Sequence, residues 1–200
     1  MKRLSLALVF ACIAMSMWAQ EAIRVNYQGS KPNISDFAAA FFSSFDDEEC
    51  GNEAINAFRQ AYLWYCNAKP QAEGDTFIMD EKNGYILYEV RNPEAPGIII
   101  KMEMCYWNES DGKHKLLAYN NMASIRDGKP LQTETTDIMF YRYDNATKKM
   151  KYCKAPGFEI DYSANYALPR HGKNITVTHW NENGTKTQST LKWNGRKFNK

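Results

Sequence analysis

The sequence predicts an α+β fold in which a pair of helices comes first and packs on an antiparallel β-meander. Between about residues 33 and 67, apolar side chains recur at the three- and four-residue spacing of helices. From about residue 76 to 198, short alternating segments are separated by turn sequences. Because each turn joins neighbouring segments, the strands are expected to be antiparallel, with one face covered by the helices. A β-sandwich or barrel with a helical prefix is the alternative.

The segment 1–19 has the pattern of a secretory signal peptide. Lys2 and Arg3 form a basic start, residues 4–15 are almost entirely apolar, and small residues follow. About twelve helical residues span roughly 18 Å, well short of a bilayer core of roughly 30 Å, so we expect a cleaved leader and not a membrane span. Cleavage after Ser16 puts small residues at both recognised positions, whereas cleavage after Ala19 places the larger Met17 at the outer one but leaves Gln20 as a plausible mature start. The mature chain is then expected to be periplasmic or secreted.

Lipid anchoring through Cys12 is not expected. Val9 to Cys12 faintly resembles the lipidation signal of bacterial lipoproteins, but Phe10 fits that pattern poorly and apolar sequence continues beyond the cysteine. No other stretch is apolar enough to form a transmembrane segment. No linker divides the remainder, so residues 20–200 are predicted to form a single domain.

Two helices are expected. The first is capped by Asn33 or Ser35, and the second begins after Gly51. The acidic run 46–49 precedes the second helix, where negative charge suits the helix dipole, and it lacks the alternating ligands and glycine of a calcium loop. The predicted buried face of the second helix consists of Ala54, Ile55, Phe58, Ala61, Tyr62 and Tyr65.

The strands are delimited by tight turns. Asn83-Gly84 is a hairpin signal, and the sequences 144–147 and 181–184 are further turns. The expected strands are 76–80, 85–91, 97–107, 114–123, 138–143, 150–153, 175–180 and 187–193. Within 97–107, one face is apolar and the other carries Lys101, Glu103, Cys105 and Trp107.

Charge argues against nucleic acid as a partner. The chain has 25 Lys and Arg and 23 Asp and Glu. Because Lys2 and Arg3 belong to the leader, the mature domain carries 23 of each and is formally neutral. Nucleic-acid binding needs a basic face that displaces counterions, which a neutral total does not favour.

Four cysteines remain after the leader, at positions 50, 66, 105 and 153. Export permits disulfides, and four cysteines allow three connectivities. Cys50 and Cys66 would lie about 22–24 Å apart along one helix, too far for a bond. Free buried cysteines and one bridge both stay open.

No catalytic or metal motif is present. The three histidines, His114, His171 and His179, lack metal-ligand spacing, and no nucleophile or phosphate-loop motif occurs. We therefore expect no catalytic residue, no metal and no cofactor. A Cys105–His114 dyad remains conceivable on one hairpin, although a cysteine within a strand is usually a core residue. Three carboxylate pairs could be drawn as a glycosidase site, but none stands out: Asp80 with Glu81, Glu89 with Glu103, and Glu159 with Asp161.

Aromatic side chains on strands provide the best binding hypothesis. The candidates are Tyr106, Trp107, Trp180 and Trp193, which could stack on sugar rings or peptide side chains, or could fill the core. Trp107 shares its face with Lys101 and is the one most expected to be exposed. Trp180 and Trp193 could pair across the final hairpin.

Three phrases carry a resemblance: residues 105–113 (CYWNESDGK), 140–144 (FYRYD) and 191–198 (LKWNGRKF). In these the chain resembles small uncharacterised exported proteins of Bacteroidetes-type bacteria, over roughly residue 97 onward. The resemblance implies a periplasmic or surface location and transfers no activity.

The sequence therefore favours an exported, non-enzymatic binding domain for a glycan or an envelope protein. The first alternative is an inhibitor of an extracytoplasmic enzyme that inserts a loop such as 168–172. The second is a small hydrolase, which would need a deep pocket with two convergent acids or Cys105 beside His114.

Overall fold

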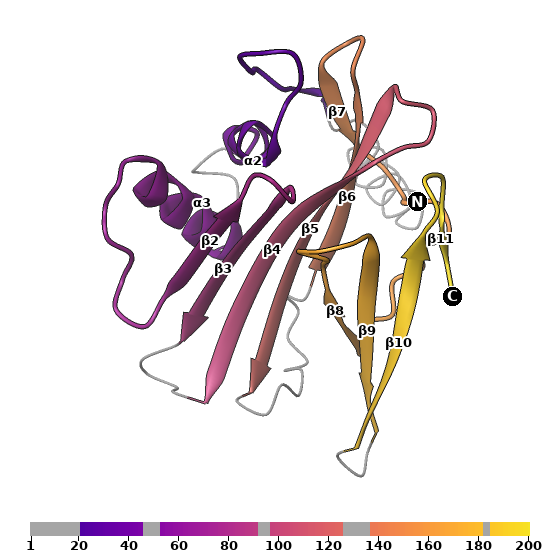
Figure 1. The fold of residues 1–200 in the computed structure, drawn as a ribbon. Helices are drawn as coiled ribbons and strands as arrows, with labels where there is room; N and C mark the ends of the chain where they lie inside the picture. The colour runs from indigo at the N-terminus through magenta and orange to yellow at the C-terminus, as the bar shows by residue number, and fades with distance from the viewer. Residues whose placement is uncertain (1–20, 46–52, 92–96, 126–136, 182–184) are drawn as a thin grey trace, which may run out of the picture.

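The computed structural model describes residues 21–45, 53–91, 97–125, 137–181 and 185–200. These residues form three layers: two helices, a seven-stranded antiparallel sheet (sheet A) and a four-stranded antiparallel sheet (sheet B) (Figure 1). The predicted α+β class, with helices first and an antiparallel meander after them, is confirmed. Of the helices within these ranges, neither is long and apolar enough to cross a membrane. The expected leader, Cys50 and the acidic run 46–49 lie outside the described residues.

The two expected helices and eight expected strands occur in the predicted order, and β1, β8 and β11 were not predicted. The helices are α2 (Ile34–Ser43) and α3 (Glu53–Cys66). Sheet A has the order β1-β7-β6-β5-β4-β3-β2, and sheet B the order β11-β10-β9-β8. The strands are β1 (Ile23–Arg24), β2 (Thr76–Asp80), β3 (Tyr85–Arg91), β4 (Ile98–Asn108), β5 (His114–Ile125), β6 (Asp137–Asp144), β7 (Lys149–Tyr152), β8 (Ala164–Ala167), β9 (Asn174–Trp180), β10 (Lys186–Trp193) and β11 (Phe198–Asn199).

Helix α2 begins at a capping box. The Asn33 side chain accepts a hydrogen bond from the Asp36 backbone N–H at 3.0 Å, and the Asp36 carboxylate accepts one from the Asn33 N–H at 2.8 Å. Two N–H groups that a helix start leaves unpaired are thereby satisfied. Asn33, one of the two expected caps, is the residue that fills this role.

Both helices cover one face of sheet A. Phe37 and Phe41 of α2 and Phe58 of α3 are buried, and Phe41 stacks on Tyr119 of β5 with ring centroids 5.2 Å apart. The predicted apolar face of α3 is confirmed at Ile55, Phe58, Ala61 and Tyr62, which are all buried. Tyr65 departs from the prediction: it is 46% exposed, because it lies in the last turn of α3, where its ring contacts Phe77 of the edge strand β2.

Strand β4 has two buried faces. Met102 and Met104 face the helices, as the alternation predicts, while Cys105 and Trp107 lie in a second core between sheets A and B. The polar residues on the second face of β4 did not predict that a second sheet covers it. Sheet B packs there because Ile175, Val177 and other inward residues of β8–β11 need an apolar partner surface.

Glu103 lies at the centre of this interface, with only 1% of its surface exposed. Its carboxylate accepts hydrogen bonds from Tyr85 Oη at 2.6 Å, Asn120 Nδ2 at 3.1 Å and the Leu168 backbone N–H at 3.1 Å. Lys101 Nζ is 3.1 Å from the same carboxylate. Burial and the neighbouring charge of Glu103 raise the pKa of Tyr85, which keeps its hydroxyl a donor. The network joins β3, β4 and β5 of sheet A to the end of β8 in sheet B.

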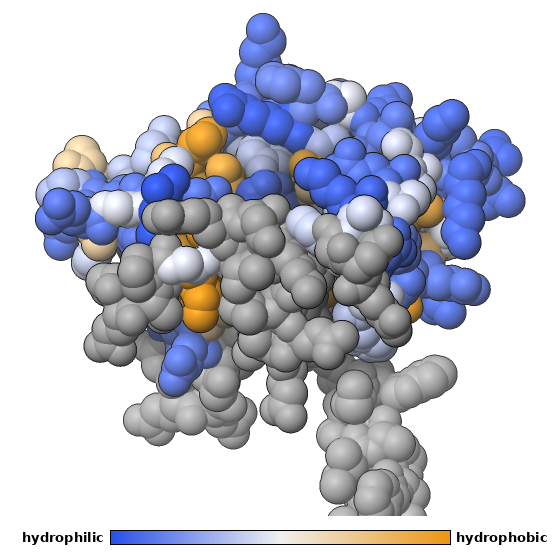
Figure 2. Space-filling view, turned by 90° about the horizontal axis from the view of Figure 1, so that it is seen from below, coloured by the Kyte–Doolittle hydropathy of each residue, from blue (hydrophilic) through white to orange (hydrophobic). Residues whose placement is uncertain are grey.

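Figure 2 shows the molecule from below, that is, from the side toward which the β9–β10 hairpin extends in Figure 1. The described residues on this face are mostly hydrophilic, with small separate hydrophobic patches. Single apolar side chains on a surface are ordinary and define no site by themselves.

Candidate functional site

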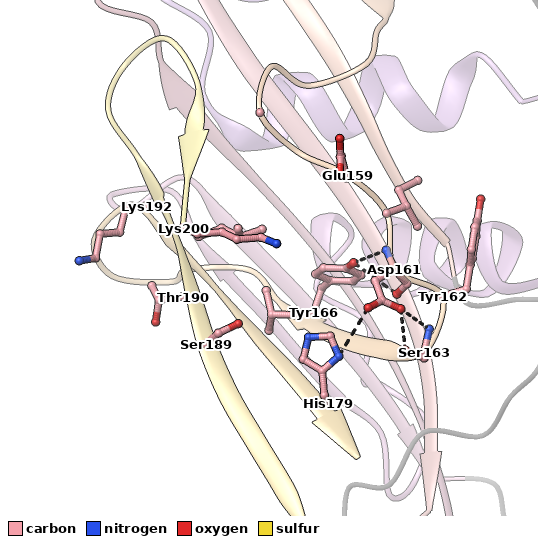
Figure 3. A pocket seen from close by; sticks show the side chains of 14 residues that line it. Glu159, Asp161, Tyr162, Ser163, Tyr166, His179, Ser189, Thr190, Lys192 and Lys200 are labelled. Atoms are coloured by element: carbon pink, nitrogen blue, oxygen red, sulfur yellow. Dashed lines mark hydrogen bonds and ion pairs between the residues drawn. The ribbon is translucent and has the colours of Figure 1, made fainter. Parts of the chain in front are cut away.

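A large hollow in the described part of the molecule is a groove in sheet B. It has a volume of about 1220 Å³ and lies between the β9–β10 hairpin and the segment 157–163 (Figure 3). Val177, Leu191 and Tyr166 contribute apolar surface to it, and Ser189, Lys192 and Lys200 contribute polar groups. We call this hollow the sheet B groove.

The groove opens because the inward face of β10 changes character along the strand. Leu191 and Trp193 are buried against sheet A, whereas the preceding inward positions, Thr187 and Ser189, are exposed. A strand packs closely only where its inward side chains are apolar. The hairpin therefore separates from sheet A toward its tip, and the segment 157–163 forms the opposite wall.

Asp161 is held rigidly in that wall. Its carboxylate accepts hydrogen bonds from the Ser163 N–H at 2.9 Å and the Ser163 hydroxyl at 2.6 Å, and its own N–H donates to Tyr166 Oη at 2.7 Å. His179 Nδ1 of β9 is 3.5 Å from Asp161 Oδ2, and Figure 3 shows the two side chains facing each other. The Ser163 hydrogen bonds, followed by the nearby imidazole, lower the pKa of Asp161, so the groove contains a carboxylate and not a carboxylic acid.

The rim of the groove carries an exposed ring. Tyr162 is 76% exposed, the highest value among the exposed large hydrophobic side chains of the described chain, and Ile160 is 40% exposed. Tyr162 lies between Asp161 and Ser163, whose mutual hydrogen bonds fix the turn that presents it. The groove thus combines an aromatic ring, a fixed carboxylate, hydroxyls and lysine ammonium groups.

The four predicted binding aromatics do not form a row. Trp107 and Trp193 are 3% and 6% exposed, and their ring centroids are 6.2 Å apart in the core between the sheets. The expectation that Trp107 is exposed is wrong, because sheet B covers its face of β4. Its indole N–H donates to the Lys173 carbonyl at 2.9 Å.

The side chains of Tyr106 and Trp180 do not join that pair. Tyr106 is half-buried on the opposite face of sheet A, where its ring meets Phe37 of α2. Trp180 is half-buried near the hairpin tip and pairs with Lys186, whose ammonium lies 6.0 Å from the ring centroid. The expected pairing of Trp180 with Trp193 is wrong, because the β9–β10 register places them at opposite ends of the hairpin. A binding role for Trp180 stays a prediction.

The conceivable dyad is not assembled. Cys105 lies opposite Ala118 in the β4–β5 register, four residues from His114 along β5. Burial, with a smaller effect of Glu103, raises the pKa of Cys105 well above its usual value, so the thiol is a core group. Within the described ranges Cys66, Cys105 and Cys153 are all free.

A second polar cluster lies at the β4–β5 turn. Glu109, Asp111 and His114 place one ligand atom each within 4.8 Å of one another. Arg142 donates two hydrogen bonds to the Glu109 carboxylate, at 2.7 and 2.6 Å, and its guanidinium is 3.7 Å from Asp111. The positive charge of Arg142 already compensates these carboxylates. The cluster is therefore explained as hydrogen bonds and ion pairs that attach the β4–β5 turn to β6.

The loop 168–172 is anchored at two points. Leu168 is buried, and Arg170 Nε donates to Asp80 Oδ2 at 2.8 Å. His171 and Gly172 are exposed. The loop is therefore short and held close to the body of the domain.

No protein-family model matches the chain, and neither a curated protein nor a solved structure matches it significantly. The resemblance to exported Bacteroidetes-type proteins stays an expectation.

The sequence identified Asp161 and His179 separately, as an acid and a histidine, but did not predict that their side chains lie close to each other. They come from a turn and a strand whose proximity depends on how β8 and β9 pair. Tyr162 and Ser163 were missed, although Asp161-Tyr162-Ser163 contains an Asp–Ser turn signal that could have marked a fixed loop.

Proposed function

We propose that this chain is an exported, non-enzymatic binding domain and that the sheet B groove holds its ligand. The signal-peptide pattern of the first nineteen residues supports export. The groove supports binding, because a concave surface with a few fixed polar groups is the usual form of a ligand site. The ligand is a glycan or a segment of an envelope protein, since sugar rings and extended peptides both stack on tyrosine and bond to carboxylates and hydroxyls.

The observation that carries the proposal is the pairing of an exposed Tyr162 with a fixed Asp161. An exposed ring on a turn that is held by hydrogen bonds loses little conformational entropy when a ligand covers it. The carboxylate beside it keeps one acceptor geometry in the absence of ligand. The site is thus preorganised for a polar ligand.

Hydrolysis is less well supported by the same groove. A general acid needs a raised pKa, whereas the pKa of Asp161 is lowered. Glu159 points away from Asp161 in Figure 3, so the two acids do not converge. In the part of the chain that the structure describes, no serine, threonine or cysteine is hydrogen-bonded to His179. The inhibitor alternative would rely on the loop 168–172, which is tied to the domain by the buried Leu168 and by the Arg170–Asp80 ion pair.

Replacing Tyr162 by alanine is expected to weaken ligand binding at the groove without changing the fold. The measurement is the thermal shift of the mature protein, from Gln20, against peptidoglycan fragments, other glycans and envelope peptides. A ligand at about 100 times its dissociation constant should add about 2.7 kcal/mol, a shift of several degrees. Loss of the stacking contact, about 1 kcal/mol, should reduce the affinity roughly fivefold.

Tyr152→Ala is the matched control, because Tyr152 is 51% exposed on β7 in sheet A and does not line the groove. It should keep the ligand-induced shift of the unchanged protein. A ligand whose shift survives in Tyr162→Ala and disappears in Tyr152→Ala would refute the groove as its site. If no ligand in the panel raises the unfolding temperature, the proposed function is refuted.

A further inference from the structure

Strand β10 has an open edge. On one side it pairs with β9 from Lys186 to Lys192. On the other side β11 pairs only with Lys192 and Trp193. Within the described residues, the stretch 186–191 has no strand neighbour on this side. An edge of that length is a template for the backbone of another chain.

The backbone groups that face the open edge can be assigned from the two adjoining turns. The Asn194 N–H donates to the Lys197 carbonyl across the β10–β11 turn. Because the bonding direction alternates along a strand, the backbone N–H and C=O groups of every second residue before Asn194 also face the β11 side. The Asn181 N–H donates to the Thr185 carbonyl across the β9–β10 turn, so the odd-numbered residues of β10 face β9. Both turns agree. Lys186, Gln188 and Thr190 therefore direct their N–H and C=O groups to the open edge.

The open edge borders the sheet B groove. Ser189, Thr190 and Lys192 of β10 line the groove, as does Lys200 directly after β11. Phe198 of β11 is buried in the core between the sheets. A strand placed in line with β11 would likewise point alternate side chains inward, into the groove beside Tyr162 and Ile160.

The charges at this edge favour an acidic occupant. Lys186, Lys192 and Lys200 are exposed, and among the described residues only Lys200 is close enough to a carboxylate to affect it, since its charge helps to lower the pKa of Asp161. Lysines protect edges against self-association. Antiparallel pairing of two copies over 186–191 would bring Lys186 of one copy near Lys192 of the other, which disfavours a second copy. Acidic side chains would instead meet the lysines.

We propose that an extended, acidic polypeptide segment of a partner protein binds here by adding a strand to β10, with alternate side chains in the sheet B groove. Main-chain hydrogen bonds to Lys186, Gln188 and Thr190 supply affinity, and the groove supplies selectivity. The inference rests on the proposed binding function of the groove and names the class of its ligand.

The test is a selection of linear dodecapeptides from a random phage-displayed library on the mature domain. Enriched peptides are expected to alternate apolar and polar residues and to carry an excess of Asp and Glu. One enriched peptide is then synthesised with and without N-methyl groups on alternate backbone nitrogens. Methylation on the face that meets β10 should weaken binding at least about tenfold, whereas methylation of the other set should not.

The matched protein variants are Thr190→Pro and Thr190→Val. Proline removes an edge-facing N–H and leaves the β9 ladder intact, which edge strands tolerate. Thr190→Pro should weaken peptide binding about tenfold with an unchanged near-UV circular dichroism spectrum, and Thr190→Val, which keeps the backbone N–H, should weaken it clearly less. If Thr190→Pro does not fold, the inference is tested by the binding of the two N-methylated peptides alone.

Two outcomes would overturn the inference and leave the proposed function in place. One is a peptide that binds equally well with either set of nitrogens methylated. The other is a library without enriched peptides combined with a glycan that stabilises the domain through Tyr162, in which case the binding function stands and its ligand is a carbohydrate. Failure of both the library and the glycan panel would remove the proposed function together with the inference.

Discussion

Replacing Glu103 by alanine is expected to lower the free energy of unfolding by about 3–5 kcal/mol, enough to unfold a marginally stable domain. The carboxylate is buried and accepts hydrogen bonds from Tyr85, Asn120 and the Leu168 N–H. Alanine would leave the Tyr85 hydroxyl, the Leu168 N–H and one N–H of the Asn120 amide without their acceptor in a buried site. Lys101 is 26% exposed and can turn to solvent, so it adds little to the loss. Urea denaturation followed by tryptophan fluorescence measures the change.

Two controls sharpen this prediction. Glu103→Gln preserves the shape and one acceptor oxygen, so it should cost less than alanine. Glu159→Gln, at an exposed position, should change the stability by no more than about 0.5 kcal/mol. A Glu103→Ala protein within about 1 kcal/mol of the unchanged chain would show that the two sheets do not depend on this carboxylate.

Replacing Gly157 by alanine is expected to destabilise the domain by about 3 kcal/mol and to displace β11. Gly157 has a φ of +73°, and an added Cβ would lie 2.2 Å from the Phe198 carbonyl oxygen. That atom belongs to the backbone and cannot rotate away. The Phe198 N–H donates to the Pro156 carbonyl at 2.9 Å, so the clash falls where the C-terminal strand is attached. Thermal unfolding monitored by circular dichroism measures the loss.

Gly172→Ala is the matched control. Its φ is +84°, but an added Cβ would meet nothing within 4 Å. It therefore isolates the backbone cost, about 1–2 kcal/mol for a left-handed conformation. Equal losses in the two variants would contradict the close approach of Gly157 to β11.

Local features of the fold were predictable from the sequence. The bounds of β2 and β3 agree with those expected from the Asn83-Gly84 turn, and Asn33 is the predicted cap of α2. These features depend on neighbouring residues. β1 and β11, with two residues each, and β8, with the sequence ANYA, were missed because they carry too little alternation to be distinguished from loops.

Features that depend on distant residues were not predictable. The alternation of β4 separates two faces but cannot show that the face of Glu103 and Trp107 is covered by a second sheet. The partners of Glu103 come from positions 85, 120 and 168, which no local pattern connects. The sheet B groove likewise depends on the loss of apolar side chains between Leu191 and Thr187 together with the turn at Asp161.

The most direct test of the sheet B groove as the ligand site is a map of backbone amide chemical shifts of the ¹⁵N-labelled mature domain. The domain would be titrated with the tightest-binding peptide from the library and, separately, with the glycan that gives the largest thermal shift. Shift changes concentrated in β9, β10 and residues 157–163 are the predicted result. Changes concentrated instead on the exposed end of α3, at Leu63, Trp64 and Tyr65, would contradict the account.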